Sequence, residues 1–300
     1  MKRLSFGTLS LGFILLLVLA AVAHNVASTY YLKEGASRAQ ATLRLTIQSL
    51  EGRLRRFEAL PVLLADDEII RSLALDSANP DLRTRANQWL KQQNMAVEAS
   101  DIYVMTLDGK TVAASNFDRP DSFVGQSFHY RPYFKDAVAG GKGRLFALGT
   151  TSGVRGYYFA TPVRSNAGTI IGVIALKIGL DEIEAEWRAQ EYRILVSDPE
   201  GIIFLSTDPA WLYRGLLPLT PERIARTNTS RRYADADVSE LPHSSTIEHG
   251  IPLIRLSGDD GAAREYLLAK QLMPMADWTV QVLLDAGYVR SQARLATAAL

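Results

Sequence analysis

The sequence predicts an α+β fold: a membrane helix and a long helical spine, followed by two modules that each hold an antiparallel sheet flanked by helices. Between residues 28 and 99, apolar side chains recur at the three- and four-residue steps of amphipathic helices. Near Ser100 the pattern changes to alternation, with turn residues between short runs, as in β-hairpins. The order strand, turn, strand, helix and further strands occurs twice, from Ser100 and from Tyr192, which indicates two modules.

The N-terminal segment predicts a membrane helix. Lys2 and Arg3 precede an uncharged, mostly apolar run from Leu4 to Ala23, which is long enough to span a bilayer. Because the basic residues come first, we expect the N-terminus in the cytoplasm and the following residues outside it. The alternative is a cleaved signal peptide, since the Ala-Val-Ala sequence ending at Ala23 resembles a cleavage site. The length of the run and the helical pattern after it favour an uncleaved anchor.

A long helix is predicted from Ser28 to Leu60, because no proline interrupts the sequence before Pro61. Its apolar residues recur at helical spacing: Leu43, Ile47, Leu50, Leu54, Phe57 and Leu60. This spacing predicts a spine for an extracytoplasmic domain, a dimer seam, or both, and it favours a parallel homodimer. Two shorter helices are expected at residues 65–77 and 81–100, with Asp81 as the N-terminal cap of the second.

The first module is expected to start with a hairpin around Asp108-Gly109. Three strands at residues 144–151, 155–165 and 168–180 and a helix at residues 181–190 complete it. The second module repeats this order. It should contain a hairpin at residues 192–207, a helix capped by Thr220, strands at residues 264–273 and 278–286, and a terminal helix. The expected segments are residues 1–27, 28–99, 100–190, 191–285 and 286–300, the last leading to a second membrane segment.

Composition excludes several classes of function. The formal net charge of +1 provides no field that would recruit nucleic acid. The chain has no cysteine, so it has neither disulfides nor thiolate metal sites. Its four histidines lack metal-ligand spacing, and we therefore expect no metal. We also expect no cofactor and no catalytic residue.

Residues 130–163 are rich in tyrosine and arginine, and they predict a site for a small anion with two carboxylates. Arg131 can clamp one carboxylate through two N–H groups, and Pro132 restricts it to extended backbone. The turn after it offers hydroxyl and amide donors from Thr150, Thr151, Ser152 and Gly153. Lys177, near the end of an apolar strand, adds a second charge. Three tyrosines supply walls with polar tips: Tyr130, Tyr133 and Tyr158.

The unbroken motifs RPYF, FALGTTSG and RGYYF resemble the extracytoplasmic sensor region of the C4-dicarboxylate sensor histidine kinases of the DctB type. The resemblance extends more weakly over most of the chain. It implies a double Cache sensor with two PAS-like (PDC) modules in the periplasm, anchored in the inner membrane. It also implies that the distal module, residues 100–190, binds succinate, malate or fumarate to regulate dicarboxylate uptake. The matching ligand-binding positions are Arg131, Thr150, Thr151, Ser152, Gly153 and Lys177, with Tyr130, Tyr133 and Tyr158 as further candidates.

The sequence departs from that family at its C-terminal end. Family members continue through a second membrane helix into a kinase core, whereas the sequence up to Leu300 shows neither a phospho-acceptor histidine box nor a glycine-rich ATP lid. We therefore expect this chain to sense a ligand and not to transfer phosphate.

Two other interpretations stay open at this stage. Double Cache modules also serve chemoreceptors for amino acids, and Asp181 is a candidate partner for the ammonium group of such a ligand, although it is better placed to cap a helix. A hydrolase would need a triad such as Ser152, His129 and Asp121, but the serine lacks the G-x-S-x-G elbow.

Overall fold

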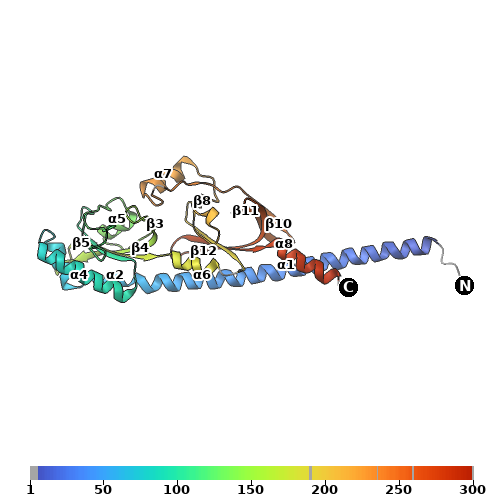
Figure 1. Ribbon diagram of the computed structural model, residues 1–300, viewed down its shortest axis with the longest axis horizontal. Helices are drawn as coiled ribbons and strands as arrows, with labels where there is room; N and C mark the ends of the chain where they lie inside the picture. The colour runs from blue at the N-terminus through green and yellow to red at the C-terminus, as the bar shows by residue number, and fades with distance from the viewer. Residues whose placement is uncertain (1–5, 189–190, 235, 259, 299–300) are drawn as a thin grey trace. The chain divides into compact units, whose positions relative to one another are not determined.

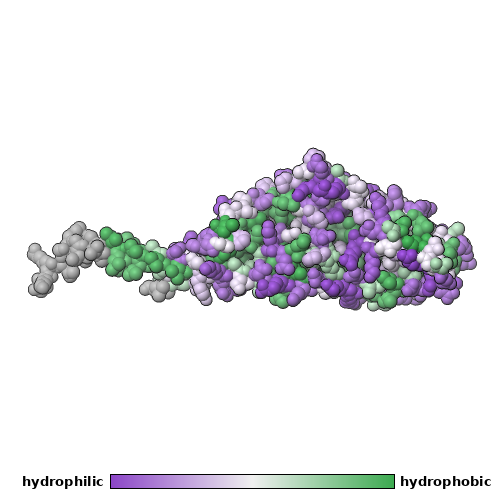
Figure 2. Space-filling model, turned by 180° about the vertical axis from the view of Figure 1, so that it is seen from behind, coloured by the Kyte–Doolittle hydropathy of each residue, from purple (hydrophilic) through white to green (hydrophobic). Residues whose placement is uncertain are grey.

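The computed structural model describes residues 6–188, 191–234, 236–258 and 260–298. Lys2 and Arg3 therefore lie outside the described residues. The last two residues of each of the predicted helices at 181–190 and 286–300 also lie outside them. The membrane run and the spine form one continuous helix, α1 (Phe6–Glu58) (Figure 1). Among the described residues, this helix near the N-terminus is long and apolar enough to cross a membrane. Figure 2 shows its apolar surface in green.

The chain divides into two compact units, and each draws on separate stretches of sequence. The first unit comprises Met1–Ile47, Trp187–Leu216 and Leu241–Leu300, and the second comprises Gln48–Glu186 and Leu217–Glu240. Helix α1 therefore contributes residues to both units.

The second unit is built on a five-stranded antiparallel sheet with the order β2-β1-β5-β4-β3. The strands are β1 (Asp101–Met105), β2 (Thr111–Ala114), β3 (Gly143–Leu148), β4 (Arg155–Arg164) and β5 (Ile170–Gly179). Helix α5 (Pro132–Val138) covers one face, while α2 (Leu60–Ala65), α3 (Glu68–Leu75) and α4 (Pro80–Val97) pack on the other (Figure 1). Helix α7 (Pro221–Thr229) also belongs to this unit.

The first unit holds a six-stranded antiparallel sheet with the order β10-β11-β12-β13-β6-β7. Its strands are β6 (Arg193–Ser197), β7 (Ile203–Ser206), β10 (His243–Glu248), β11 (Ile251–Ser257), β12 (Ala263–Met273) and β13 (Trp278–Asp285). This unit also holds the short 3-10 helix η1 (Pro209–Trp211), the two-residue strand β8 (Arg214–Gly215) and α8 (Ala286–Ala298). The two-residue strand β9 (Ser239–Glu240) and most of α6 (Asp181–Arg188) belong to the second unit. The predicted α+β class, with an apolar N-terminal helix and antiparallel sheets, is confirmed.

Local chemistry explains most element boundaries. Thr220 caps α7 by accepting a hydrogen bond from the Arg223 amide, and Pro221 takes the first helical position, as predicted. The predicted cap of α4 is wrong. Asn79, not Asp81, accepts the bonds from the first-turn amides, while Asp81 lies inside the first turn, where its charge favours the helix dipole.

The apolar stripe of α1 is not available as a dimer seam. Its members are almost completely buried within the chain: Leu43, Ile47, Leu50, Leu54 and Phe57. The predicted helical period is correct, but periodicity alone does not tell whether a helix packs on its own chain or on a second copy. The stripe stabilises the fold of this chain.

A close approach between α5 and β3 requires glycine at position 143. A Cβ atom there would overlap the Tyr133 carbonyl group and lie 2.6 Å from the Tyr133 Cα atom. Gly52, by contrast, is exposed on α1, and a Cβ atom added to it would have no neighbour within 4 Å.

We predict that Gly143→Ala destabilises the protein by about 2 kcal/mol or more, because a rigid backbone group must move. The matched change Gly52→Ala should stabilise it by about 0.5–1 kcal/mol, since alanine loses less backbone entropy in a helix. Urea unfolding of both variants measures the two effects. Equal stabilities for Gly143→Ala and the wild type would contradict the α5–β3 packing.

Candidate ligand-binding site

A row of side chains crosses three strands on the α5 face of the second unit. Lys177 on β5 is paired in register with Asp101 on β1 and with Tyr158 on β4. Directly opposed residues of antiparallel strands point to the same face, so these three side chains share one side of the sheet. Val173 and Ala175 lie on this face too, within the buried cluster that includes Tyr158, because side chains alternate along β5.

Lys177 is a buried cation with few partners. Its side chain is 1% exposed, and its Nζ donates to Ser152 Oγ at 2.8 Å. The Nζ also lies 6.0 Å from the centre of the Phe123 ring and 5.8 Å from that of Tyr158. Burial lowers the pKa of Lys177. Among the described residues, Ser152 is its hydrogen-bond partner and no carboxylate lies within ion-pair distance.

Two glycines allow the Thr150–Gly153 turn and Lys177 to come together. A Cβ at Gly149 would collide with Ser152 Oγ, and one at Gly156 would lie 2.6 Å from Lys177 Cε. Gly153 has a φ of 66°, a conformation that favours glycine. Its amide donates to the Gly149 carbonyl at 2.9 Å.

The turn is partly open to solvent. Thr150, Thr151 and Ser152 are half-buried and Gly153 is exposed. The Thr150 Oγ1 and the Tyr130 hydroxyl share a hydrogen bond of 3.0 Å. The structure therefore brings the turn together with Tyr130 and, through Ser152, with Lys177.

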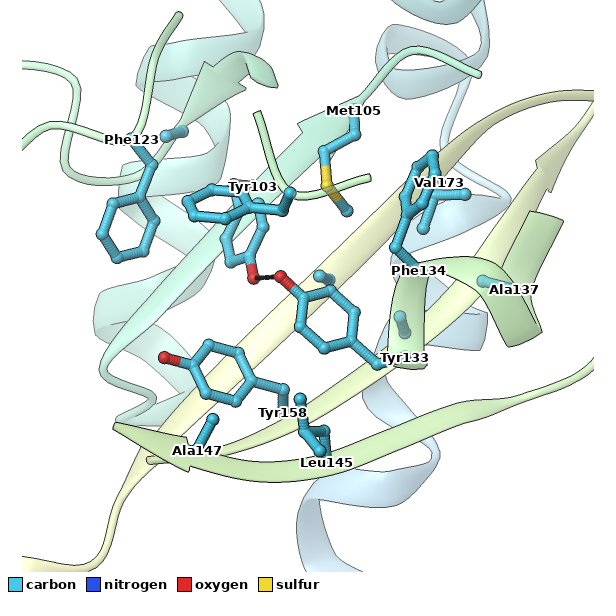
Figure 3. Packing of buried hydrophobic residues seen from close by; sticks show 14 residues of the cluster. Tyr103, Met105, Phe123, Tyr133, Phe134, Ala137, Leu145, Ala147, Tyr158 and Val173 are labelled. Carbon is cyan, nitrogen blue, oxygen red and sulfur yellow. Dashed lines mark hydrogen bonds between the residues drawn. The ribbon is translucent and has the colours of Figure 1, made fainter. Parts of the chain in front are cut away.

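Tyr133 and Tyr158 belong to the buried cluster of side chains on this face (Figure 3). Their rings stack with centroids 5.3 Å apart and an interplanar angle of 5°. The Tyr133 hydroxyl shares a 2.6 Å hydrogen bond with that of Tyr103, drawn as a dashed line in Figure 3. Burial raises the pKa of all three tyrosines above the ordinary value, so their hydroxyls stay neutral.

Arg131 is buried, and its donors are directed to backbone carbonyls. It precedes α5 in extended backbone, as Pro132 predicted. Its NH1 donates to the carbonyls of Ser230 and Arg231 at 3.1 and 2.9 Å, and its NH2 to that of Leu148 at 3.0 Å. Arg131 thus holds a segment about a hundred residues later in the chain beside the strand that leads into the turn.

Asp101 is a site residue that the sequence analysis missed. Its side chain is buried, its Oδ1 has no hydrogen-bond partner, and the Arg119 guanidinium lies 3.4 Å away. Burial raises the pKa of Asp101 to about 6, although Arg119 and Lys177 oppose the shift. The only sequence signal was its place at the start of a strand, which becomes informative once the register with Lys177 is known.

The residues of the other two interpretations are engaged elsewhere. Asp181 pairs with Arg155 at 2.6 Å. Of the hydrolase triad, Ser152 binds Lys177, His129 binds the Ser127 hydroxyl at 3.0 Å, and Asp121 binds Arg119. Each member therefore has a different partner.

Comparisons with known proteins agree with this architecture. The family model of the Cache domain matches residues 23–293. The C4-dicarboxylate transport sensor protein DctB of Rhizobium meliloti is 34% identical over 258 residues, 83% of this chain and 40% of that protein. The protein of the same name from Pseudomonas aeruginosa is 38% identical over 194 residues, 65% of this chain and 32% of that protein. The chain therefore spans less than half the length of these curated relatives.

Solved structures give the same picture. The sensor domain of the histidine kinase DctB of V. cholerae superposes with a TM-score of 0.77 at 30% identity, covering 83% of this chain and 96% of that one. The ligand-binding domain of a Campylobacter jejuni chemoreceptor, in complex with L-valine, superposes at 0.56 with 14% identity, covering 88% and 98%. The second likeness concerns the fold alone.

With its family model matched over most of its length, the chain belongs to the Cache domain family of ligand-binding sensor domains. Its resemblance to the sensor region of the DctB-type proteins, predicted from RPYF and FALGTTSG, is confirmed. The matched region is a sensor domain rather than a kinase core. Together with the apolar N-terminal helix, the family indicates a membrane protein with an extracytoplasmic sensor domain.

The raised pKa of Asp101 leads to a prediction about stability. The folded state holds this proton more tightly than the unfolded state, whose carboxyl has the ordinary pKa of 3.8. The contribution of Asp101 to stability is therefore full below pH 4 and is lost as the pH rises toward about 6. The free energy of unfolding of Asp101→Asn should match that of the wild type near pH 4 and exceed it by up to about 3 kcal/mol at pH 7.5.

Denaturant unfolding between pH 4 and 8 measures this difference. Asp136→Asn, at an exposed carboxylate of α5, is the matched control and should show a much smaller pH-dependent gain. A difference between Asp101→Asn and the wild type that does not vary with pH contradicts the assignment.

Proposed function

We propose that this chain senses C4-dicarboxylates in the periplasm, as the input region of a two-component sensor histidine kinase of the inner membrane that regulates dicarboxylate uptake. The observation that carries the proposal is the buried ammonium of Lys177, whose hydrogen-bond partner among the described residues is one neutral hydroxyl. A buried cation that no carboxylate contacts directly is costly, and a carboxylate from a ligand would compensate that cost.

The surroundings of Lys177 suit a small dianion. We propose the second unit, which comprises Gln48–Glu186 and Leu217–Glu240, as the ligand-binding module, and the first unit as the membrane-proximal module. The expected bounds of 100–190 and 191–285 divide the chain differently, because Leu217–Glu240 packs with the second unit. One carboxylate would bind Lys177 and Ser152, and the second would bind donors of Thr150, Thr151 and the Gly153 region beside Tyr130. The stacked rings of Tyr133 and Tyr158 limit the length of the ligand.

In this proposal Arg131 acts in two ways. Its positive charge lies beside Tyr130, with the guanidinium carbon 5.3 Å from the ring centre, and it raises the potential for an anion. Its three hydrogen bonds to carbonyls fix the walls of the site. A ligand carboxylate that bonded Arg131 directly would use its remaining N–H groups.

Asp101 supports a second candidate, an amino-acid ligand of the kind that chemoreceptors with this fold bind. Its Oδ1, which has no hydrogen-bond partner and lies 3.4 Å from the Arg119 guanidinium, would accept a hydrogen bond from the ammonium group, while Lys177 would bind the carboxylate. Calorimetric titration of the chain with succinate, malate and fumarate, and separately with amino acids, decides between the two ligand classes.

We propose that ligand binding shifts a population of conformations and that helix α1, which contributes to both units, carries the change toward the membrane. We also propose that the chain forms a parallel homodimer and that an exposed stripe of α1 near the membrane forms its interface. Its members are Val22, Val26 and Tyr30, which are 55%, 62% and 63% exposed.

We predict that Lys177→Met abolishes dicarboxylate binding while the protein stays folded, because methionine fills the site without a charge. For the wild-type chain in detergent, succinate at a hundred times its Kd should add about 2.7 kcal/mol of stability. This corresponds to a rise in melting temperature of about 5–10 °C.

The control is Lys142→Met, which removes an exposed lysine of the same unit and should keep the full rise. Absence of a rise in the wild type with succinate, malate and fumarate would refute the proposed ligand class. An undiminished rise in Lys177→Met would refute the role of this lysine.

The dimer proposal predicts that a single cysteine in place of Val26 forms a disulfide-linked dimer in membranes, because the chain has no cysteine of its own. A cysteine in place of Ala39, which is completely buried, should stay monomeric under the same oxidation. Non-reducing gel electrophoresis measures both. Equal cross-linking at the two positions speaks against this seam.

A further inference from the structure

The segment Leu217–Glu240 packs with the unit that holds the candidate site, although the chain on both sides of it belongs to the other unit. It leaves the first unit after Leu216 and returns at Leu241. Its helix α7 ends at Thr229, and the residues that follow contact the elements of the site.

Residues 230–233 are held by three kinds of contact. Arg131 donates to the carbonyls of Ser230 and Arg231. The amide of Leu148, the last residue of β3, donates to the Arg232 carbonyl at 2.7 Å. The ring of Tyr233 is buried, 6.1 Å from that of Phe146 on the same strand.

These contacts lie directly beside the turn that would bind the ligand. The Leu148 amide donates a hydrogen bond to the segment, and the Leu148 carbonyl accepts one from Arg131. Gly149 and Thr150 follow Leu148 in the chain. A change in the turn therefore reaches the segment through one residue.

Arg231 presents a guanidinium at the rim of the site. Its guanidinium carbon lies 5.3 Å from the centre of the Tyr130 ring, and the hydroxyl of that ring bonds Thr150. The side chain is exposed, and in the described part of the chain no carboxylate lies within ion-pair distance of it. Its φ of 48° is unusual for a residue with a side chain, and the carbonyl contacts hold it there.

We infer that Arg231 is a further ligand-recognition residue and that residues 230–233 close on the site when a dianion occupies it. This inference rests on the proposed function. The guanidinium is charged at all physiological pH values and can meet a carboxylate with two N–H groups, which the neutral hydroxyls of the turn cannot do. Because both ends of the segment continue into the first unit, its closure reaches that unit through the chain itself.

The experiment measures succinate affinity by calorimetry on the full chain in detergent. Arg231→Ala should weaken binding about tenfold or more, with a larger loss at low salt, because a charge-assisted contact disappears. Arg231→Lys should recover part of the affinity. The control Arg85→Ala removes an exposed arginine of α4 and should bind as the wild type does. Melting temperatures without ligand check that every variant is folded.

Hydrogen exchange adds a readout that a purely structural role would not change. In the wild type, succinate should slow exchange of the Leu148 amide and of the peptide containing residues 230–233, and Arg231→Ala should reduce this protection. Wild-type affinity in Arg231→Ala overturns the inference and leaves the proposed function intact. A wild-type chain that binds none of succinate, malate and fumarate overturns the proposed function and the inference with it.

Discussion

Burying the ammonium of Lys177 inside the second unit is the constraint on which the site depends. The side chain lies opposite Asp101 and Tyr158 in a sheet whose register fixes all three on one face. Taking a charge out of water costs several kcal/mol unless other groups meet it. The nearby Asp101, the Ser152 hydroxyl and two aromatic rings offset part of this cost. The part of the burial cost that these groups do not offset favours a negatively charged ligand.

The rest of the site is arranged around that cation. Gly149 and Gly156 leave the space in which the turn approaches Lys177, and Gly143 allows α5 to lie close to β3. The stacked tyrosines provide a rigid floor, because their hydroxyls are neutral and Tyr133 is tied to Tyr103. Charge at the centre and rigidity around it are what a selective site for a small anion needs.

The sequence predicted the elements whose signals are local. Hydrophobic period, proline and turn residues located α1, α7 and the strands of the second unit, and Lys177 was expected near the end of an apolar strand, which is β5. The hairpin of β10 and β11 was missed because β10 is exposed along most of its length and so shows no apolar alternation. The prediction of the dimer seam was wrong for a related reason. A periodic apolar stripe shows that one face of a helix is covered, but it does not show whether the same chain or a second copy covers it.

The parts of the candidate site that the sequence did not predict depend on contacts between residues far apart in the chain. Arg131 bonds carbonyls 99 and 100 residues later, and backbone carbonyls carry no residue-specific signal. The role of Asp101 follows only from its register with a residue on another strand. Charged residues near RPYF and the TTSG turn could be found by inspection, whereas the partners of those charges required the fold.

The most direct test of the central claim is the pKa of Lys177 itself, followed by NMR of a chain labelled with carbon-13 at the lysine Cε. In the free protein the pKa should lie below the ordinary value of 10.5, because burial disfavours the charged form. Saturating succinate should raise it, since a carboxylate beside the ammonium stabilises the proton. A pKa at the ordinary value that does not change with succinate would contradict the account.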